Sequence, residues 1–105
     1  METKYNLKIT PSAANDLDGI YAYICETLHT PTSAQNLMDS IEAAFLSLQD
    51  VPYRCELSRN ETLREKGYRK LVINSYVALY LVDNHAKQVI IARVFYGAMD
   101  YEKYL

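Results

Sequence analysis

The side chains best suited to act on a phosphate lie in the second half of the chain. Arg69 and Lys70 are adjacent, Arg93 lies in a β-rich run that ends at Tyr96, and Tyr101 follows. Cationic groups can stabilise the charge that develops in phosphoryl transfer, whereas a tyrosine, with an ordinary pKa of about 10, needs strong cationic help to act as a base at neutral pH. Ten tyrosines in 105 residues are more simply interpreted as strand and interface residues.

Arg93 allows two interpretations. It interrupts the otherwise apolar run from residue 89 to residue 96, and a charged group in a central strand must reach a carboxylate or the edge of the sheet. Arg93 could form a structural ion pair with Asp100 or Asp83, or it could contact a binding partner. The same two roles are open to Asp100.

The histidines and cysteines do not form a pattern typical of catalysis. His29 and His85 have no cysteine or carboxylate at ligand spacing, so we expect neither a metal site nor another cofactor. Cys25 lies at the edge of an apolar stripe and Cys55 in a charged loop. Neither has an evident resolving partner, so redox control is not expected.

The elements that must position these residues are those of a small protein. The chain has 105 residues, half of them apolar and 23% charged, which predicts one globular domain over residues 1–105. With two cysteines and no apolar stretch at the N-terminus, we expect a cytoplasmic protein without a disulfide framework. No apolar run approaches the roughly 18 to 20 residues that span a bilayer, so no membrane segment is expected.

The first half predicts a strand and a helical hairpin. Residues 5–9 alternate between apolar and polar side chains, as in a half-buried strand. Thr10-Pro11 and Thr30-Pro31 are both typical helix starts. The apolar residues after them recur at steps of three and four, which places them on one stripe of each helix: Ala13, Leu17, Ile20, Tyr21, Ile24 and Leu28, then Ala34, Leu37, Met38, Ile41, Phe45 and Leu48.

The second half predicts a loop and three strands. Residues 51–67 are crowded with charge and could hold one helical turn at 60–66. Strands are expected at 68–73, 76–83 and 89–96, with Asn74-Ser75 as a two-residue turn. The expected fold is therefore α+β, in the order β-α-α-β-β-β, with an antiparallel sheet packed on the helical hairpin. Residues 97–105 would form a short tail.

The hairpin turn divides the side chains between two faces of the sheet. One face carries Lys70, Val72, Val77, Leu79 and Leu81, and the other carries Arg69, Leu71, Ile73, Tyr76, Ala78 and Tyr80. The helical hairpin can cover only one face, although both are mostly apolar. The second face is therefore expected to be covered by the tail, another subunit or a different protein.

The charge is distributed unevenly along the chain. The formal net charge of −2 disfavours direct nucleic-acid binding. Residues 1–53 hold two basic and seven acidic side chains, whereas residues 54–105 hold nine basic and six acidic ones. An anionic partner is expected to prefer the second half, unless the two sets are only solvated faces.

The second half of the chain resembles a known family. The chain resembles the RelE/ParE superfamily of type II toxins. The resemblance is carried by two segments, GYRKLVINSYVALYLVD and VIIARVFYGAMDYEKYL, and by the strand-helix-helix order upstream of them. The resemblance covers nearly the whole chain. It implies a two-gene operon and a cognate antitoxin that wraps the toxin with its C-terminal segment, giving a hetero-oligomer.

The superfamily has two activities, and the resemblance extends to the positions that separate them. RelE-like members cut mRNA in the ribosome with basic residues on a sheet face, whereas ParE-like members contact DNA gyrase and are not nucleases. The positions of the basic residues correspond here to Lys70, Val72, Val77 and Met99. Because valine and methionine cannot stabilise phosphoryl charge, the ParE-like activity is favoured, and the protein is not expected to be an enzyme.

The sheet faces and the resemblance together suggest which residues contact the target and which contact the antitoxin. For contact with the target, expected to be gyrase, the candidates are Arg69, Lys70, Arg93, Tyr96, Asp100 and Tyr101; a nuclease would use Lys70, Arg69, Arg93, Tyr96 and Tyr101. For the antitoxin, the candidates are Val72, Val77, Leu79 and Leu81, and an amphipathic antitoxin segment is expected on an apolar surface bordered by the first helix and the sheet. The alternatives are a RelE-like ribosome-dependent endoribonuclease and a degenerate toxin that only binds its antitoxin.

Overall fold

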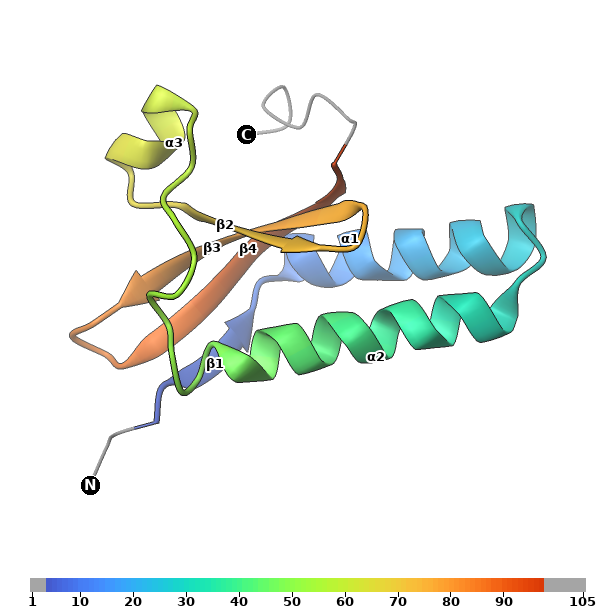
Figure 1. Ribbon diagram of the computed structural model, residues 1–105, viewed down its shortest axis with the longest axis horizontal. Coiled ribbons are helices and arrows are strands. Elements are labelled where there is room, and N and C mark those ends of the chain that lie inside the picture. The colour runs from blue at the N-terminus through green and yellow to red at the C-terminus, as the bar shows by residue number, and fades with distance from the viewer. Residues whose placement is uncertain (1–3, 98–105) are drawn as a thin grey trace.

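The computed structural model describes residues 4–97, in which a four-stranded sheet packs on a pair of long helices (Figure 1). The tail positions 98–105, including Asp100 and Tyr101, lie outside the described residues. In chain order, the elements are β1 (Asn6–Ile9), α1 (Pro11–Ala22), a π-helical turn (Tyr23–Thr27), α2 (Pro31–Ser47), α3 (Glu61–Glu65), β2 (Arg69–Ile73), β3 (Tyr76–Asp83) and β4 (Gln88–Tyr96).

The helices begin where the Thr-Pro pairs predict. The Thr10 side chain accepts a hydrogen bond from the Ala13 amide at 3.1 Å, and Pro11 occupies the first position of α1. The expected single helix to residue 28 ends instead in the π-helical turn, where the Leu28 amide donates to the Tyr23 carbonyl five residues back. This turn precedes His29, whose φ of 52° breaks the helix before α2.

The sheet order is β1-β4-β3-β2. The expected hairpin is confirmed, because Ile73 pairs with Tyr76 across the Asn74-Ser75 turn. The expectation of a fully antiparallel sheet is wrong for one pair, since β1 runs parallel to β4. The connection from β1 to β4 contains both long helices, α3, β2 and β3, and is long enough to return the chain for such a parallel pairing.

The main core lies between the helical hairpin and one face of the sheet. Ile41 and Phe45 of α2 are each 2% exposed and belong to one buried cluster with Ala78, Tyr80 and Val94 of the sheet. The sheet side chains come from the face that carries Arg69 and Tyr80 in the expected division. The ends of the helices project beyond the sheet (Figure 1), and Leu28, although on the predicted stripe, is therefore 52% exposed.

The opposite face of the sheet is covered at its centre by a short element. Leu63 of α3 forms a second buried cluster with Val77, Leu79 and Phe95, and Tyr68 packs against it. The expectation that only the tail or a partner would cover this face is therefore wrong at its centre. The Asn60 side chain accepts from the Leu63 amide at 2.9 Å, which fixes the start of α3.

None of the helices formed by residues 4–97 is both long enough and apolar enough to cross a bilayer.

Candidate functional site

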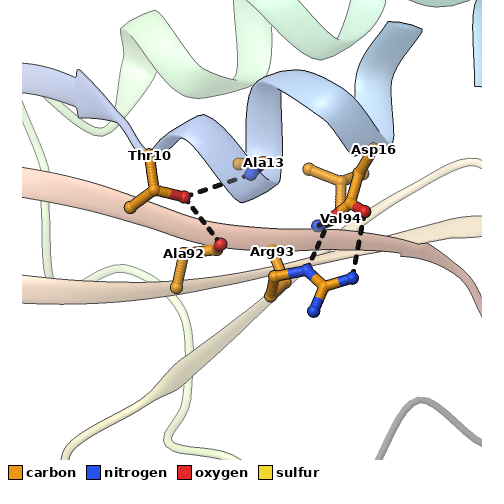
Figure 2. Close-up of polar contacts among 6 residues, drawn as sticks. All are labelled: Thr10, Ala13, Asp16, Ala92, Arg93 and Val94. Atoms are coloured by element: carbon orange, nitrogen blue, oxygen red, sulfur yellow. Dashed lines mark hydrogen bonds and ion pairs between the residues drawn. The ribbon is translucent and has the colours of Figure 1, made fainter. Parts of the chain in front are cut away.

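An ion pair joins α1 to β4 near the point where β1 ends (Figure 2). Arg93 donates through Nε to Asp16 Oδ2 at 2.8 Å and through Nη2 to Oδ1 at 3.1 Å. The same Oδ2 accepts from the Val94 amide at 2.9 Å. One carboxylate thus holds a side chain and the main chain of β4, a charge-assisted arrangement that fixes α1 against the strand.

A β-bulge sets the orientation of this region. The register between β3 and β4 shifts between Leu79 and Tyr80, whose partners are Arg93 and Ile91, so Ala92 is the additional residue. The Thr10 hydroxyl donates to the Ala92 carbonyl at 2.8 Å. The cap of α1 and the bulge in β4 therefore stabilise one another (Figure 2).

Arg93 pairs with Asp16, a residue 77 positions away, and not with the expected Asp83. Asp83 instead accepts hydrogen bonds from the His85 and Ala86 amides at 3.0 Å each, and Asp100 lies outside the described residues. The hydrogen bond to Asp16 raises the pKa of Arg93 above its ordinary value, although burial acts in the opposite direction. The guanidinium carbon also lies 4.6 Å from the centre of the Phe95 ring.

An apolar groove of about 800 Å³ opens beside this ion pair, between α1 and the end of β4. We call it the α1–β4 groove; its lining comprises Asn15, Asp16, Gly19, Ile20, Tyr23, Leu28, Tyr76, Arg93, Val94, Phe95 and Tyr96. The Tyr76 and Tyr96 rings meet edge to face, with centroids 5.7 Å apart. Burial, and to a smaller extent Tyr96 and Tyr23, raise the pKa of Tyr76, which favours its neutral form.

The predicted cationic residues do not converge on one point. Arg69 donates to the Cys55 carbonyl at 2.6 Å and stacks over Tyr53 at 4.9 Å. Lys70 is on the opposite face of β2, in a cross-strand row with Leu79 and Arg93. Two strand spacings, about 10 Å, therefore separate the backbones of Lys70 and Arg93.

The predicted antitoxin-binding residues differ in exposure. Val72 is 61% exposed, whereas Val77 and Leu79 are buried in the cluster beneath α3. Leu81 is half-buried. Only Val72 and part of Leu81 can therefore offer surface to a partner in this conformation.

Residues 4–97 contain no group of three or more His, Cys, Asp or Glu side chains placed to hold a metal ion.

The residues that sequence reasoning missed are on the helix side of the groove. Asp16 lies 77 positions from Arg93, and no local pattern indicates a pairing over that separation. Gly19 carried a weak signal, since a glycine inside a helical pattern often has a packing or functional reason. A Cβ at Gly19 would meet no described atom within 4 Å, so this position faces open space.

Comparisons with known proteins agree with this architecture. A family model described as the ParE toxin of the type II toxin-antitoxin system, parDE, matches residues 7–101. Among solved structures, the chain is similar to the chromosomal ParDE system from P. aeruginosa, with 27% identity and a TM-score of 0.71 over 89% of this chain and 96% of that one. The comparison with curated proteins gives no match.

A more distant similarity concerns the fold alone. A RelBE toxin-antitoxin complex from Mycobacterium tuberculosis shows 24% identity and a TM-score of 0.61, over 89% of this chain and 98% of that chain. Together, the sheet, the helical hairpin, the family model and the similarity to the ParDE system define a toxin of the RelE/ParE superfamily. Within that class, the chain belongs to the ParE toxin family of type II toxin-antitoxin systems.

Proposed function

We propose that this toxin arrests growth by inhibiting DNA gyrase through protein contact, without cutting RNA, and that a cognate antitoxin neutralises it. The observation that carries the proposal is that the residues that a nuclease would need are bound to other groups or buried. Arg93 is bound to Asp16 by two hydrogen bonds, and Arg69 is bound to a main-chain carbonyl. Val77, at a position where the nuclease branch has a cation, is buried.

Among the described residues that we predict to bind the target, Lys70 and Tyr96 have the side chains most accessible to a partner. Both line a small hollow of about 380 Å³, together with Val72 and Gly97. Tyr96 is 49% exposed, and Lys70 is half-buried. A tyrosine beside an exposed valine suits a protein interface, because aromatic side chains contribute strongly to such interfaces. The Lys70 charge beside them can add electrostatic complementarity.

The test is induced expression of the full chain without its neighbouring antitoxin gene. We expect growth arrest, DNA breaks trapped on gyrase and intact mRNA. Rapid mRNA cleavage would instead identify a RelE-like endoribonuclease. An absence of arrest, from protein shown to be folded, would identify a degenerate toxin that only binds its antitoxin.

Two matched variants locate the target surface. Lys70→Ala should weaken the arrest and the gyrase-linked breaks by more than about tenfold, as expected for a residue central to an interface. Lys8→Ala removes the same charge from an exposed position on β1 and should leave both unchanged. Equal potency of the two variants would exclude Lys70 from the target contact.

A further inference from the structure

Three tyrosine side chains from different parts of the chain line the α1–β4 groove. Tyr23 belongs to the π-helical turn after α1, Tyr76 is the first residue of β3, and Tyr96 is the last residue of β4. Tyr23 is 55% exposed and Tyr96 is 49% exposed, whereas Tyr76 is half-buried. Tyr23 and Tyr76 take no part in the proposed contact with gyrase.

The three rings lie close together and are inclined to one another. The planes of Tyr76 and Tyr96 meet at 66°, with centroids 5.7 Å apart. The pKa of Tyr76 is raised by burial and also by Tyr96 and Tyr23, an effect that requires phenol groups near one another. A ligand group in this part of the groove can therefore contact more than one ring.

Aromatic rings in this arrangement suit a positively charged ligand. The face of an aromatic ring attracts an organic cation that lies within about 6 Å of its centre, and sets of rings recognise quaternary ammonium groups. The groove already contains one such contact, because the Arg93 guanidinium carbon lies 4.6 Å from the centre of the Phe95 ring. Arg93 also donates two hydrogen bonds to Asp16, which compensates its charge and leaves the groove open to a second cation.

The charge of the surrounding chain also favours a cation. Residues 9–53, which include both long helices, hold six acidic side chains and no lysine or arginine. Two of these acidic residues, Asp18 and Glu26, are exposed on α1 and on the π-helical turn, the elements that form the helical wall of the groove. A surface of one sign raises the local concentration of ligands of the opposite sign.

We propose that the α1–β4 groove binds an organic cation, whose alkylammonium or guanidinium head group is held between the rings of Tyr23, Tyr76 and Tyr96. The ring faces and the acidic side chains of the helical wall both attract the positive charge. A free polyamine and an arginine or lysine side chain of another protein carry the same kind of head group. The site does not depend on the proposed action on gyrase.

Two other exposed tyrosines among residues 4–97 lack this arrangement. Tyr53 is 50% exposed, and its ring already lies 4.9 Å from the guanidinium carbon of Arg69. Tyr21 is 38% exposed on α1 and does not line the groove. The rings of Tyr21 and Tyr53 are therefore internal controls for non-specific contact.

Titration of the full chain with choline, followed by NMR, tests the site. The control ligand is the uncharged isostere of choline, in which a carbon atom replaces the quaternary nitrogen. We expect choline to shift the ring signals of Tyr23, Tyr76 and Tyr96 to saturation, and the isostere to bind at least about tenfold more weakly. Equal affinities would show that the groove recognises only an apolar shape and would overturn the inference. Shifts of the same size at Tyr21 and Tyr53 would also overturn it, because they would show non-specific contact with exposed rings.

A pair of substitutions separates the aromatic face from its apolar bulk. Tyr23→Phe keeps an aromatic ring, whereas Tyr23→Leu keeps an apolar side chain without one. We expect the affinity for choline to stay within about twofold of wild type in Tyr23→Phe and to fall at least about threefold in Tyr23→Leu. Tyr21→Leu, outside the groove, should leave the affinity unchanged, and circular dichroism verifies that all three variants fold. Equal affinities of Tyr23→Phe and Tyr23→Leu would contradict the cation site.

Two further ligands distinguish the sources of the head group. Putrescine represents a free polyamine, and N-acetylarginine amide represents an arginine side chain of a protein. Tighter binding of putrescine would assign the groove to a small metabolite, and tighter binding of the arginine derivative would assign it to a protein partner; both results support the site. If neither ligand shifts the ring signals of Tyr23, Tyr76 and Tyr96, choline is an adventitious additive only and the inference fails.

Discussion

At the scale of single residues, Asp16 has a structural role that the sequence does not reveal, because it binds both the side chain of Arg93 and the main chain of Val94. Its side chain is 16% exposed and that of Arg93 is 24% exposed, so the pair is largely removed from water. Removal of one member would take this contact from a charge that is partly buried, which costs more than loss of an exposed ion pair. Asp18, on the same helix, is exposed and provides a matched control.

Asp16→Ala should lower the free energy of unfolding by about 2–3 kcal/mol, because Arg93 and the Val94 amide both lose an acceptor. Asp16→Asn retains an oxygen for one of them and should cost roughly half as much. Asp18→Ala should change stability by less than about 0.5 kcal/mol. Urea unfolding followed by circular dichroism measures all three, and equal stability of Asp16→Ala and Asp18→Ala would show that the pair is not stabilising.

Tyr80 couples stability to pH. Its ring is fully buried, and its hydroxyl donates to the Pro52 carbonyl at 2.9 Å. Burial, with hydrogen bonding to Cys55, raises the pKa of Tyr80 above its ordinary value. The neutral phenol is therefore favoured in the folded state, and the stability that it contributes is fully present below a pH of about 10 and is lost as the pH rises toward the folded pKa.

Tyr80→Phe should cost about 1 kcal/mol at pH 7, because the hydrogen bond to Pro52 is lost. Above a pH of about 10, the wild-type protein should lose up to about 1.4 kcal/mol per pH unit through this tyrosine, and the variant should lose correspondingly less. Urea titrations at several pH values check the difference. Tyr53→Phe, at a half-exposed ring, controls for removal of a hydroxyl, and parallel curves for wild type and Tyr80→Phe would refute the coupling.

At the scale of elements, α3 has an influence that its five residues do not suggest. A single side chain, Leu63 at 5% exposure, covers the centre of the second sheet face. The element keeps Val77 and Leu79 from solvent, so it also determines which parts of that face can meet a partner. Its start is fixed by the Asn60 side chain.

Leu63→Ala should lower the free energy of unfolding by about 2–3 kcal/mol through lost burial and the cavity that remains. Leu46→Ala, at a position that is 45% exposed on α2, removes the same atoms and should cost less than about 1 kcal/mol. Chemical denaturation measures both variants. Similar costs would mean that α3 does not hold the second cluster together.

At the scale of the whole molecule, the uneven distribution of charge between the two halves of the chain predicts an effect on the rate at which the antitoxin associates. The second half carries the basic excess, and Arg64 and Lys66 are exposed at α3. Long-range attraction toward an acidic partner acts mainly on the association rate. A pair of exposed lysines in the first half, Lys4 and Lys8, allows a comparison at the same net charge.

Replacing Arg64 and Lys66 together by glutamate should slow antitoxin association by about tenfold at low salt, with little change in dissociation. Replacing Lys4 and Lys8 together by glutamate alters the net charge equally and should have a smaller effect. Surface plasmon resonance at two ionic strengths measures both rates. Equal slowing by the two variants would show that only net charge, and not its distribution, steers the encounter.

The helix starts, the apolar stripes and the register of the β2–β3 hairpin were determined by the sequence itself. Capping by Thr10, the proline starts, the apolar stripes and the Asn74-Ser75 turn all act within a few residues, so they could be predicted. Only the tertiary structure decided the remainder: that β1 lies parallel to β4, that α3 covers the second face, and that Arg93 pairs with Asp16. These contacts join residues far apart in the chain, and they depend on how the elements pack, which no local pattern encodes.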